Sequence, residues 1–110
     1  MKINFDDKKL EKIANNDRLR LREFGKLRSE KLRLRLAQLN YALNLEILRI
    51  QPGNYHELSG NRKGQWACDL DQPYRLIFTP LQNPIPVKSN GQFDWRKITE
   101  VKILEIINYH

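Results

Sequence analysis

The stretch QWACDLDQPYRLIFT, residues 65–79, contains two runs in which apolar and polar side chains alternate. Its alternating apolar members are Trp66, Cys68 and Leu70, then Tyr74, Leu76 and Phe78. Between the runs, Asp71-Gln72-Pro73 has the composition of a tight turn. Because successive side chains of a strand point to opposite faces, the stretch predicts an antiparallel hairpin with one apolar face.

Further strand signals lie on both sides of this hairpin. Residues 55–58 favour a strand, and a polar turn follows over 59–64. Residues 98–109 are rich in Ile and Val and predict a long strand, whereas 80–95 contain three prolines and predict an irregular excursion. A weak alternation at 1–5 indicates a short strand. We therefore expect a small antiparallel sheet, with Trp66, Leu76, Phe78 and Ile103 in the core beneath it.

The N-terminal half has helical character. Asp6 or Asp7 can cap a first helix, and Gly25 is typical of a helix terminator. Residues 26–43 predict the clearest helix, and 45–50 predict a shorter helical piece. On the helix over 26–43, the expected buried stripe consists of Leu32, Leu36, Leu39 and Leu43. The expected solvent face of the same helix consists of Arg28, Lys31, Arg35 and Gln38.

Helices followed by strands indicate an α+β fold. A chain of 110 residues suits one domain over 1–110, helical over 1–52 and mostly β over 53–110. We expect the helices to pack on one face of the sheet.

Charge is concentrated in the first half of the chain. The whole chain carries a net charge of +7, and residues 1–44 account for +6 of it, with 12 basic and 6 acidic residues. A basic chain of this kind favours a polyanionic partner, either nucleic acid or a very acidic protein. The first residues contain no apolar run, so we expect a cytoplasmic protein without a secretory signal or a membrane contact.

Composition argues against two other classes of site. The single cysteine, Cys68, excludes a disulfide framework and a multi-cysteine zinc site. The two histidines, His56 and His110, lack metal-ligand spacing, and we expect neither a metal nor another cofactor.

Several residues together have the chemistry needed to cleave RNA. In this reaction the 2′-hydroxyl attacks the adjacent phosphate, so the site needs a general base, a general acid and fixed cations. Histidine suits proton transfer near neutral pH, and arginine suits bidentate contact with phosphate. The candidates are His56, Arg75, Tyr109 and His110 for catalysis, and Arg62 and Lys63 for the substrate backbone. On the helix 26–43, Lys31 and Arg35 are candidates for contact with RNA. An antiparallel sheet could bring the catalytic group to one side.

Three blocks of sequence resemble the HigB branch of the RelE/ParE toxin superfamily. They are YHELSGNRKGQW at 55–66, YRLIF at 74–78 and IINYH at 106–110. The resemblance covers residues 53–110, including the proline-containing excursion, while the helical part agrees in layout.

The resemblance implies a RelE-like fold and a ribosome-dependent mRNA endonuclease, the toxin of a type II toxin–antitoxin module. It implies a HigA-like helix-turn-helix antitoxin, through which the toxin would be linked to operator DNA. By position, His56 and Arg75 match catalytic residues of the family. Asn108, Tyr109 and His110 match a terminal Asp-Tyr-His motif.

Two other functions remain open from the sequence. One is a ParE-like toxin that binds DNA gyrase without cleaving RNA, against which the two histidines argue. The other is a degenerate member that binds only its antitoxin and operator. Ser59, where the family often has Lys, and Asn108, where it has Asp, leave that alternative open.

Overall fold

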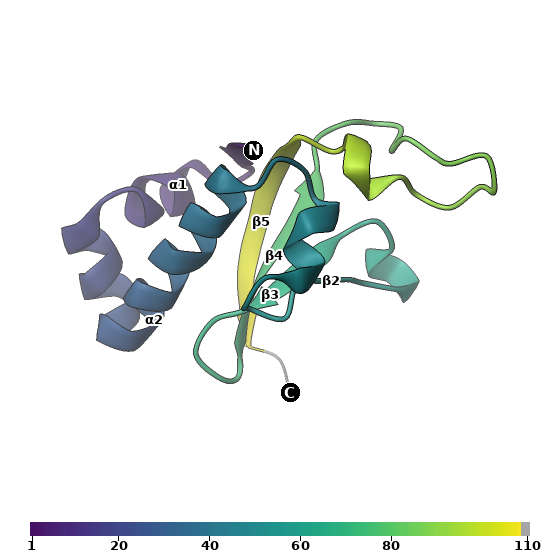
Figure 1. The fold of residues 1–110 in the computed structure, drawn as a ribbon. Coiled ribbons are helices and arrows are strands. Elements are labelled where there is room, and N and C mark those ends of the chain that lie inside the picture. Colours follow the sequence, from purple (N-terminus) through teal and green to yellow (C-terminus); the bar gives the residue numbers. More distant parts are fainter. Residues whose placement is uncertain (109–110) are drawn as a thin grey trace.

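The computed structural model describes residues 1–108 and shows a five-stranded sheet with two α-helices packed on one of its faces. Figure 1 shows α1 and α2 together on one side of the sheet, while the long loop between β4 and β5 projects away from them. The strands and α-helices, in chain order, are β1 (Lys2–Phe5), α1 (Lys8–Ala14), α2 (Asp17–Tyr41), β2 (His56–Glu57), β3 (Trp66–Asp69), β4 (Tyr74–Pro80) and β5 (Glu100–Asn108). Three short 3₁₀ helices are η1 (Glu46–Ile50), η2 (Gly60–Arg62) and η3 (Trp95–Lys97).

The sheet has the strand order β1-β5-β4-β3-β2. The hairpin predicted from the alternation is confirmed, because β3 and β4 pair antiparallel with Trp66 opposite Phe78 and Cys68 opposite Leu76. The expectation of an entirely antiparallel sheet is wrong, since β1 pairs parallel with β5. Alternation within a strand does not specify which neighbour it meets, and here two strands from opposite ends of the chain pair side by side.

The core lies between the helices and one face of this sheet. Trp66, Leu76, Phe78 and Ile103 are completely buried, as expected. Leu32 and Leu39 of α2 pack against the same cluster. The irregular excursion is confirmed as a long loop, which returns to the core through the buried Trp95.

Helix α2 consists of two helical segments, 17–24 and 26–41, joined at a kink. Gly25, with φ of +79° and ψ of 170°, separates them, so its predicted role as a terminator is confirmed. The second segment ends at Tyr41 because Ala42 is extended, two residues earlier than the predicted 26–43. Leu43 therefore leaves the expected buried stripe and is 79% exposed.

Contrary to expectation, the basic stripe of α2, formed by Arg28, Lys31 and Arg35, does not face solvent. Arg35 is buried and donates from Nε to the carbonyl of Asp69 at 2.7 Å. Arg28 holds the Asp71 carboxylate through two hydrogen bonds, of 3.0 and 3.2 Å, and Lys31 is half-buried. Residues 28, 32, 35 and 39 are spaced like one helical stripe, and the end of β3 and the loop after it offer acceptors to its arginines. The assignment of Arg35 to a solvent-facing RNA contact is therefore wrong, while the one for Lys31 stays a prediction.

Candidate active site and neighbouring cavities

The face of the sheet turned away from α1 and α2, here called the helix-free face, collects the predicted catalytic residues that the structure describes. The strand register forms one row of His56, Ala67, Ile77 and Glu105, and a neighbouring row of Asp69, Arg75 and Ile107. His56 and Arg75 thus share one face, roughly 12 Å apart at their Cα atoms by two strand spacings and a two-residue step. This separation allows both side chains to contact one nucleotide-sized ligand.

His56 lies on the edge strand β2 and is half-buried. Its Nδ1 is 2.7 Å from the carbonyl oxygen of Asn54. Because a carbonyl oxygen only accepts hydrogen bonds, Nδ1 carries the proton in this contact. In the neutral ring, Nε2 therefore has the lone pair and can accept a proton from a substrate.

Arg62 reaches across the helix-free face from the loop that follows β2. Its Nη1 donates to Gln65 Oε1 at 2.8 Å, and its Nη2 lies 3.4 Å from Glu105 Oε1 on β5. With His56 it lines a hollow of about 370 Å³. Arg75, on β4, has its Nε 3.4 Å from Asp69 Oδ1 on the adjacent strand. Among residues 1–108, the face therefore presents one imidazole and two guanidinium groups, each guanidinium paired with a carboxylate.

Lys63 separates from Arg62, although the two are adjacent in sequence. Its Nζ lies 6.0 Å from the ring centroid of Phe93, on the other side of the β2 edge. The predicted pair of backbone-binding cations is therefore divided between two surfaces. Tyr109 and His110, the other predicted catalytic residues, lie outside the described residues.

Two carboxylates of the helix-free face, Asp69 and Glu105, were not among the predicted site residues. The register of β4 and β5 shifts between Ile77 and Phe78, which makes Leu104 the extra residue of a bulge. An unbroken strand would place Glu105 on the apolar side with Ile103. The sequence signal for this arrangement is one acidic residue among the apolar residues 103–107.

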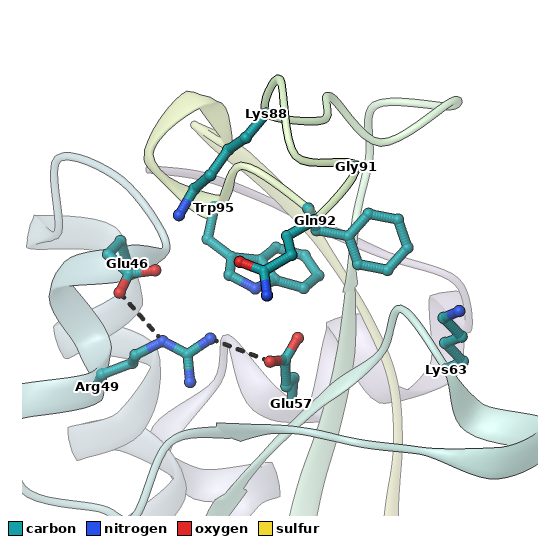
Figure 2. Close-up of a pocket in the computed structure, with 9 residues that line it drawn as sticks. Glu46, Arg49, Glu57, Lys63, Lys88, Gly91, Gln92 and Trp95 are labelled. Carbon is teal, nitrogen blue, oxygen red and sulfur yellow. Dashed lines mark hydrogen bonds and ion pairs between the residues drawn. The ribbon is translucent and has the colours of Figure 1, made fainter.

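A second cavity of about 600 Å³ lies between η1, β2 and the β4–β5 loop, and Figure 2 shows its lining. Arg49 stands at its base, with Nε 3.2 Å from Glu46 and Nη2 3.3 Å from Glu57. The guanidinium carbon of Arg49 is 4.8 Å from the centroid of the Trp66 ring. The remaining lining residues are Lys63, Lys88, Gly91, Gln92, Phe93 and Trp95.

A third surface is apolar and lies along the outside of α2. A groove of about 390 Å³ is lined by Leu34, Ala37, Tyr41, Leu43 and Ile47, among others. Tyr41 is 84% exposed and Leu43 79%, so this groove has an unusually apolar rim.

Neither a metal cluster nor a membrane span is found in the part of the chain that the structure describes. Among residues 1–108, no three His, Cys, Asp or Glu side chains gather closely enough to hold a metal ion. No helix in that range is both long and apolar enough to cross a membrane.

This arrangement of helices on one face of a small sheet has a counterpart among solved structures. The chain resembles a chain of the solved YoeB-YefM complex from Staphylococcus aureus, with a TM-score of 0.57 and 17% identity, over 100% of this chain and 97% of that one. At this identity, the likeness shows the fold alone. The family model described as "RelE-like toxin of type II toxin-antitoxin system HigB" matches residues 3–104.

The chain therefore belongs to the HigB-like family of RelE-like toxins of type II toxin–antitoxin systems. This confirms the family inferred from the three sequence blocks and the expected α+β fold. No curated protein sequence matches the chain.

Proposed function

We propose that this chain is an endoribonuclease that cleaves mRNA on the ribosome, in the cytoplasm, and that a HigA-like antitoxin neutralises it. Membership of the family makes a toxin the starting point. The observation that carries the nuclease assignment is the strand register, which brings His56 and Arg75 to the helix-free face beside Arg62.

The proposed reaction is an attack of the 2′-hydroxyl on the adjacent phosphorus. The 2′-oxygen–phosphorus bond forms, the bond to the 5′-oxygen breaks, and the products are a 2′,3′-cyclic phosphate and a 5′-hydroxyl. The Nδ1–H contact of His56 supports its role as the base, because Nε2 is then the proton acceptor. His110 is the proposed acid for the 5′-oxygen, and Tyr109 would orient the scissile phosphate.

Arg75 and Arg62 are proposed to stabilise the charge on the phosphorane. Each already lies beside a carboxylate, Asp69 and Glu105 respectively. Fixed carboxylates hold guanidinium groups in place before the substrate binds, which favours preorganised charge stabilisation. Arginine also offers two parallel donors to a phosphate. The proposed chemistry needs side chains alone.

Cleavage of a defined message on purified ribosomes tests this proposal. Primer extension should show cuts with the parent chain, and His56→Ala and Arg75→Ala should each slow cleavage by roughly 10²–10⁴-fold. Lys12→Gln is the matched control, because it also removes one positive charge but at an exposed position on α1. Circular dichroism of each variant establishes that it is folded.

Three results would overturn the assignment. Cleavage by His56→Ala at the parental rate would remove the mechanism. Growth arrest without any cut message, together with inhibited supercoiling by gyrase, would favour the ParE-like alternative instead. A chain that binds its antitoxin but causes neither effect would be the degenerate member.

The apolar groove of α2 is the proposed contact for the antitoxin. Leu27, Leu34 and Tyr41 are spaced seven residues apart and are 59%, 43% and 84% exposed, so they form a seam on which a partner helix can pack. The segment around them carries much of the +6 charge of residues 1–44. A second copy would bring like charges together, whereas an amphipathic helix with acidic flanks fits both features.

Calorimetry with the product of the neighbouring gene tests this contact. Leu34→Glu should weaken binding at least about tenfold, because it places a charge in the centre of an apolar interface. Leu21→Glu is the matched control, since Leu21 is similarly exposed but precedes Gly25. Equal affinity of the two variants would place the antitoxin elsewhere, and self-association of the free chain lost in Leu34→Glu would indicate a homodimer.

A further inference from the structure

The cavity between η1, β2 and the β4–β5 loop lies on the opposite side of the β2 edge from the helix-free face. Glu57 borders both this cavity and the hollow that contains His56. The volume of the cavity, about 600 Å³, is within the range of small-ligand sites. The segments that build it are far apart in sequence, and apart from Lys63 none of its lining residues has a role in the proposed reaction.

The base of the cavity consists of hydrogen-bond acceptors held by one cation. Arg49 spans Glu46 and Glu57, and in both contacts the carboxylate uses its Oε1 atom. No further hydrogen bond to either carboxylate occurs among residues 1–108. Figure 2 shows both carboxylates beside Arg49 at the cavity. Their other oxygens can therefore accept hydrogen bonds from a ligand, and the base has one more negative than positive charge.

The rim of the cavity is cationic and its wall is aromatic. Lys63 and Lys88 line it from two different loops, and no carboxylate in the described part of the chain lies within ion-pairing distance of either. Phe93 is half-buried, and its ring centroid lies 5.1 Å from that of the buried Trp95. This packing holds the ring in place, so that a flat ligand can stack on its exposed part.

Cations at the rim, an aromatic wall and carboxylates at the base together match a nucleotide. Phosphate oxygens suit the two lysines, and a base suits the ring of Phe93. An acidic peptide would meet Glu46 and Glu57, and a basic one would meet the lysines. The carboxylates accept hydrogen bonds from the amino group of cytosine, whereas they repel the O4 oxygen of uracil at the same position.

We propose that this cavity binds one nucleotide of the RNA substrate, with the base stacked on Phe93 and an exocyclic amino group directed to Glu46 and Glu57. Lys63 and Lys88 hold its phosphate. This inference rests on the proposed RNA substrate and adds to it a base-reading site outside the catalytic face. The site prefers cytosine to uracil.

Titration of the full chain with CMP and with UMP tests the site without ribosomes. The indole N–H resonance of Trp95 reports binding, because Trp95 lines the cavity. CMP should bind about tenfold more tightly than UMP. Phe93→Leu, which keeps an apolar side chain at the position, should weaken the binding of CMP by about tenfold. Lys88→Gln should weaken the binding of CMP and flatten the salt dependence of that binding. Lys12→Gln should change neither the affinity nor its salt dependence.

Several outcomes would overturn the proposal. These are no change with either nucleotide at millimolar concentration, equal binding of CMP and UMP, and a response to inorganic phosphate as strong as that to CMP. Displacement of CMP by an acidic peptide of higher affinity would assign the cavity to a protein partner. The cleavage assay separates the two proposals. A chain that cuts message but does not bind CMP loses only this site. A chain that binds CMP without cutting keeps a nucleotide site but loses the nuclease assignment and, with it, the assignment of this site to an RNA substrate.

Discussion

Arg35 joins α2 to the end of β3 and to the turn that precedes β2. Besides the carbonyl of Asp69 at 2.7 Å, its guanidinium reaches the side chain of Gln38 at 3.2 Å and the carbonyl of Pro52 at 3.4 Å. The Tyr55 hydroxyl donates to the same Gln38 oxygen at 2.8 Å. This cluster stabilises the packing of the helix against the hairpin end of the sheet.

Arg35→Met should lower the free energy of unfolding by about 2–4 kcal/mol, because it leaves the part-buried carbonyl of Asp69 without its charged donor. Arg33→Met, an exposed change two residues away, should cost much less. Urea denaturation followed by circular dichroism measures both. Similar midpoints for the two variants would show that the Arg35 contacts do not stabilise the fold.

Cys68 is completely buried beside Tyr55. Burial raises the pKa of the Cys68 thiol from its ordinary value of 9.0 to about 12, and burial likewise raises the pKa of Tyr55. The unfolded chain therefore releases these protons at a lower pH than the folded chain does. The resulting stability is complete below pH 9 and is lost as the pH rises toward 12.

We expect the urea midpoint to fall as the pH rises from the ordinary thiol pKa of 9.0 toward the raised pKa of about 12. Cys68→Ala should reduce the slope of this fall. The thiol should also resist alkylation until the chain unfolds, because the thiolate is the reactive form. Rapid alkylation of the native protein would contradict the buried, protonated state.

The break in α2 and the turn before β2 both depend on glycine. Gly25 separates the two segments of α2 with φ of +79°, and no atom lies within 4 Å of where a Cβ would stand. Gly53 has φ of +121°, and a Cβ there would come within 2.9 Å of Arg35 Nε. Its carbonyl also accepts from the Asp69 amide at 2.8 Å.

Gly25→Ala should cost about 1–3 kcal/mol through backbone strain alone. Gly53→Ala should cost more, because it adds a steric clash with the Arg35 cluster to the same kind of strain. Thermal denaturation of both variants under one set of conditions gives the comparison. A smaller loss for Gly53→Ala would mean that the Arg35 side chain moves aside without cost.

The molecule as a whole is elongated and basic. It measures 47 × 28 × 24 Å and carries a net charge of +7. The proposed catalytic face, the nucleotide cavity and the apolar groove occupy different parts of this surface. A charge of this sign attracts the chain to a polyanion such as the ribosome over distances set by the ionic strength.

For the same reason, kcat/KM for cleavage on the ribosome should fall steeply with added salt, while kcat at saturation should change little. Association depends on long-range attraction, whereas the bond-breaking step depends on groups already in contact. Cleavage rates at limiting and saturating ribosome concentration, measured over a range of KCl, separate the two. A kcat/KM that does not change with salt would show that long-range electrostatic attraction does not drive association with the ribosome.

Much of the fold follows from local pattern. The alternation over 65–79 predicts the β3–β4 hairpin, because a two-residue period leaves only one face for Trp66 and Phe78. The helical spacing of Leu32 and Leu39 and the glycine at 25 predict α2 and its break. The three sequence blocks were sufficient to identify the family. Each of these signals lies within a short segment, where local sterics and burial act directly.

Other features depend on contacts between distant segments. Arg35 is buried because the last residue of β3, Asp69, offers a carbonyl to that stripe of α2. Glu105 reaches the helix-free face because a bulge shifts the register of β5, and β1 runs parallel to β5, with Lys2 opposite Glu100 and Phe5 opposite Ile103. Arg62 and Lys63, adjacent in sequence, point to different surfaces. The local sequence of a segment sets the periodicity of its side chains. The surface that each side chain faces, and the partners that it contacts, depend on which elements pack against the segment.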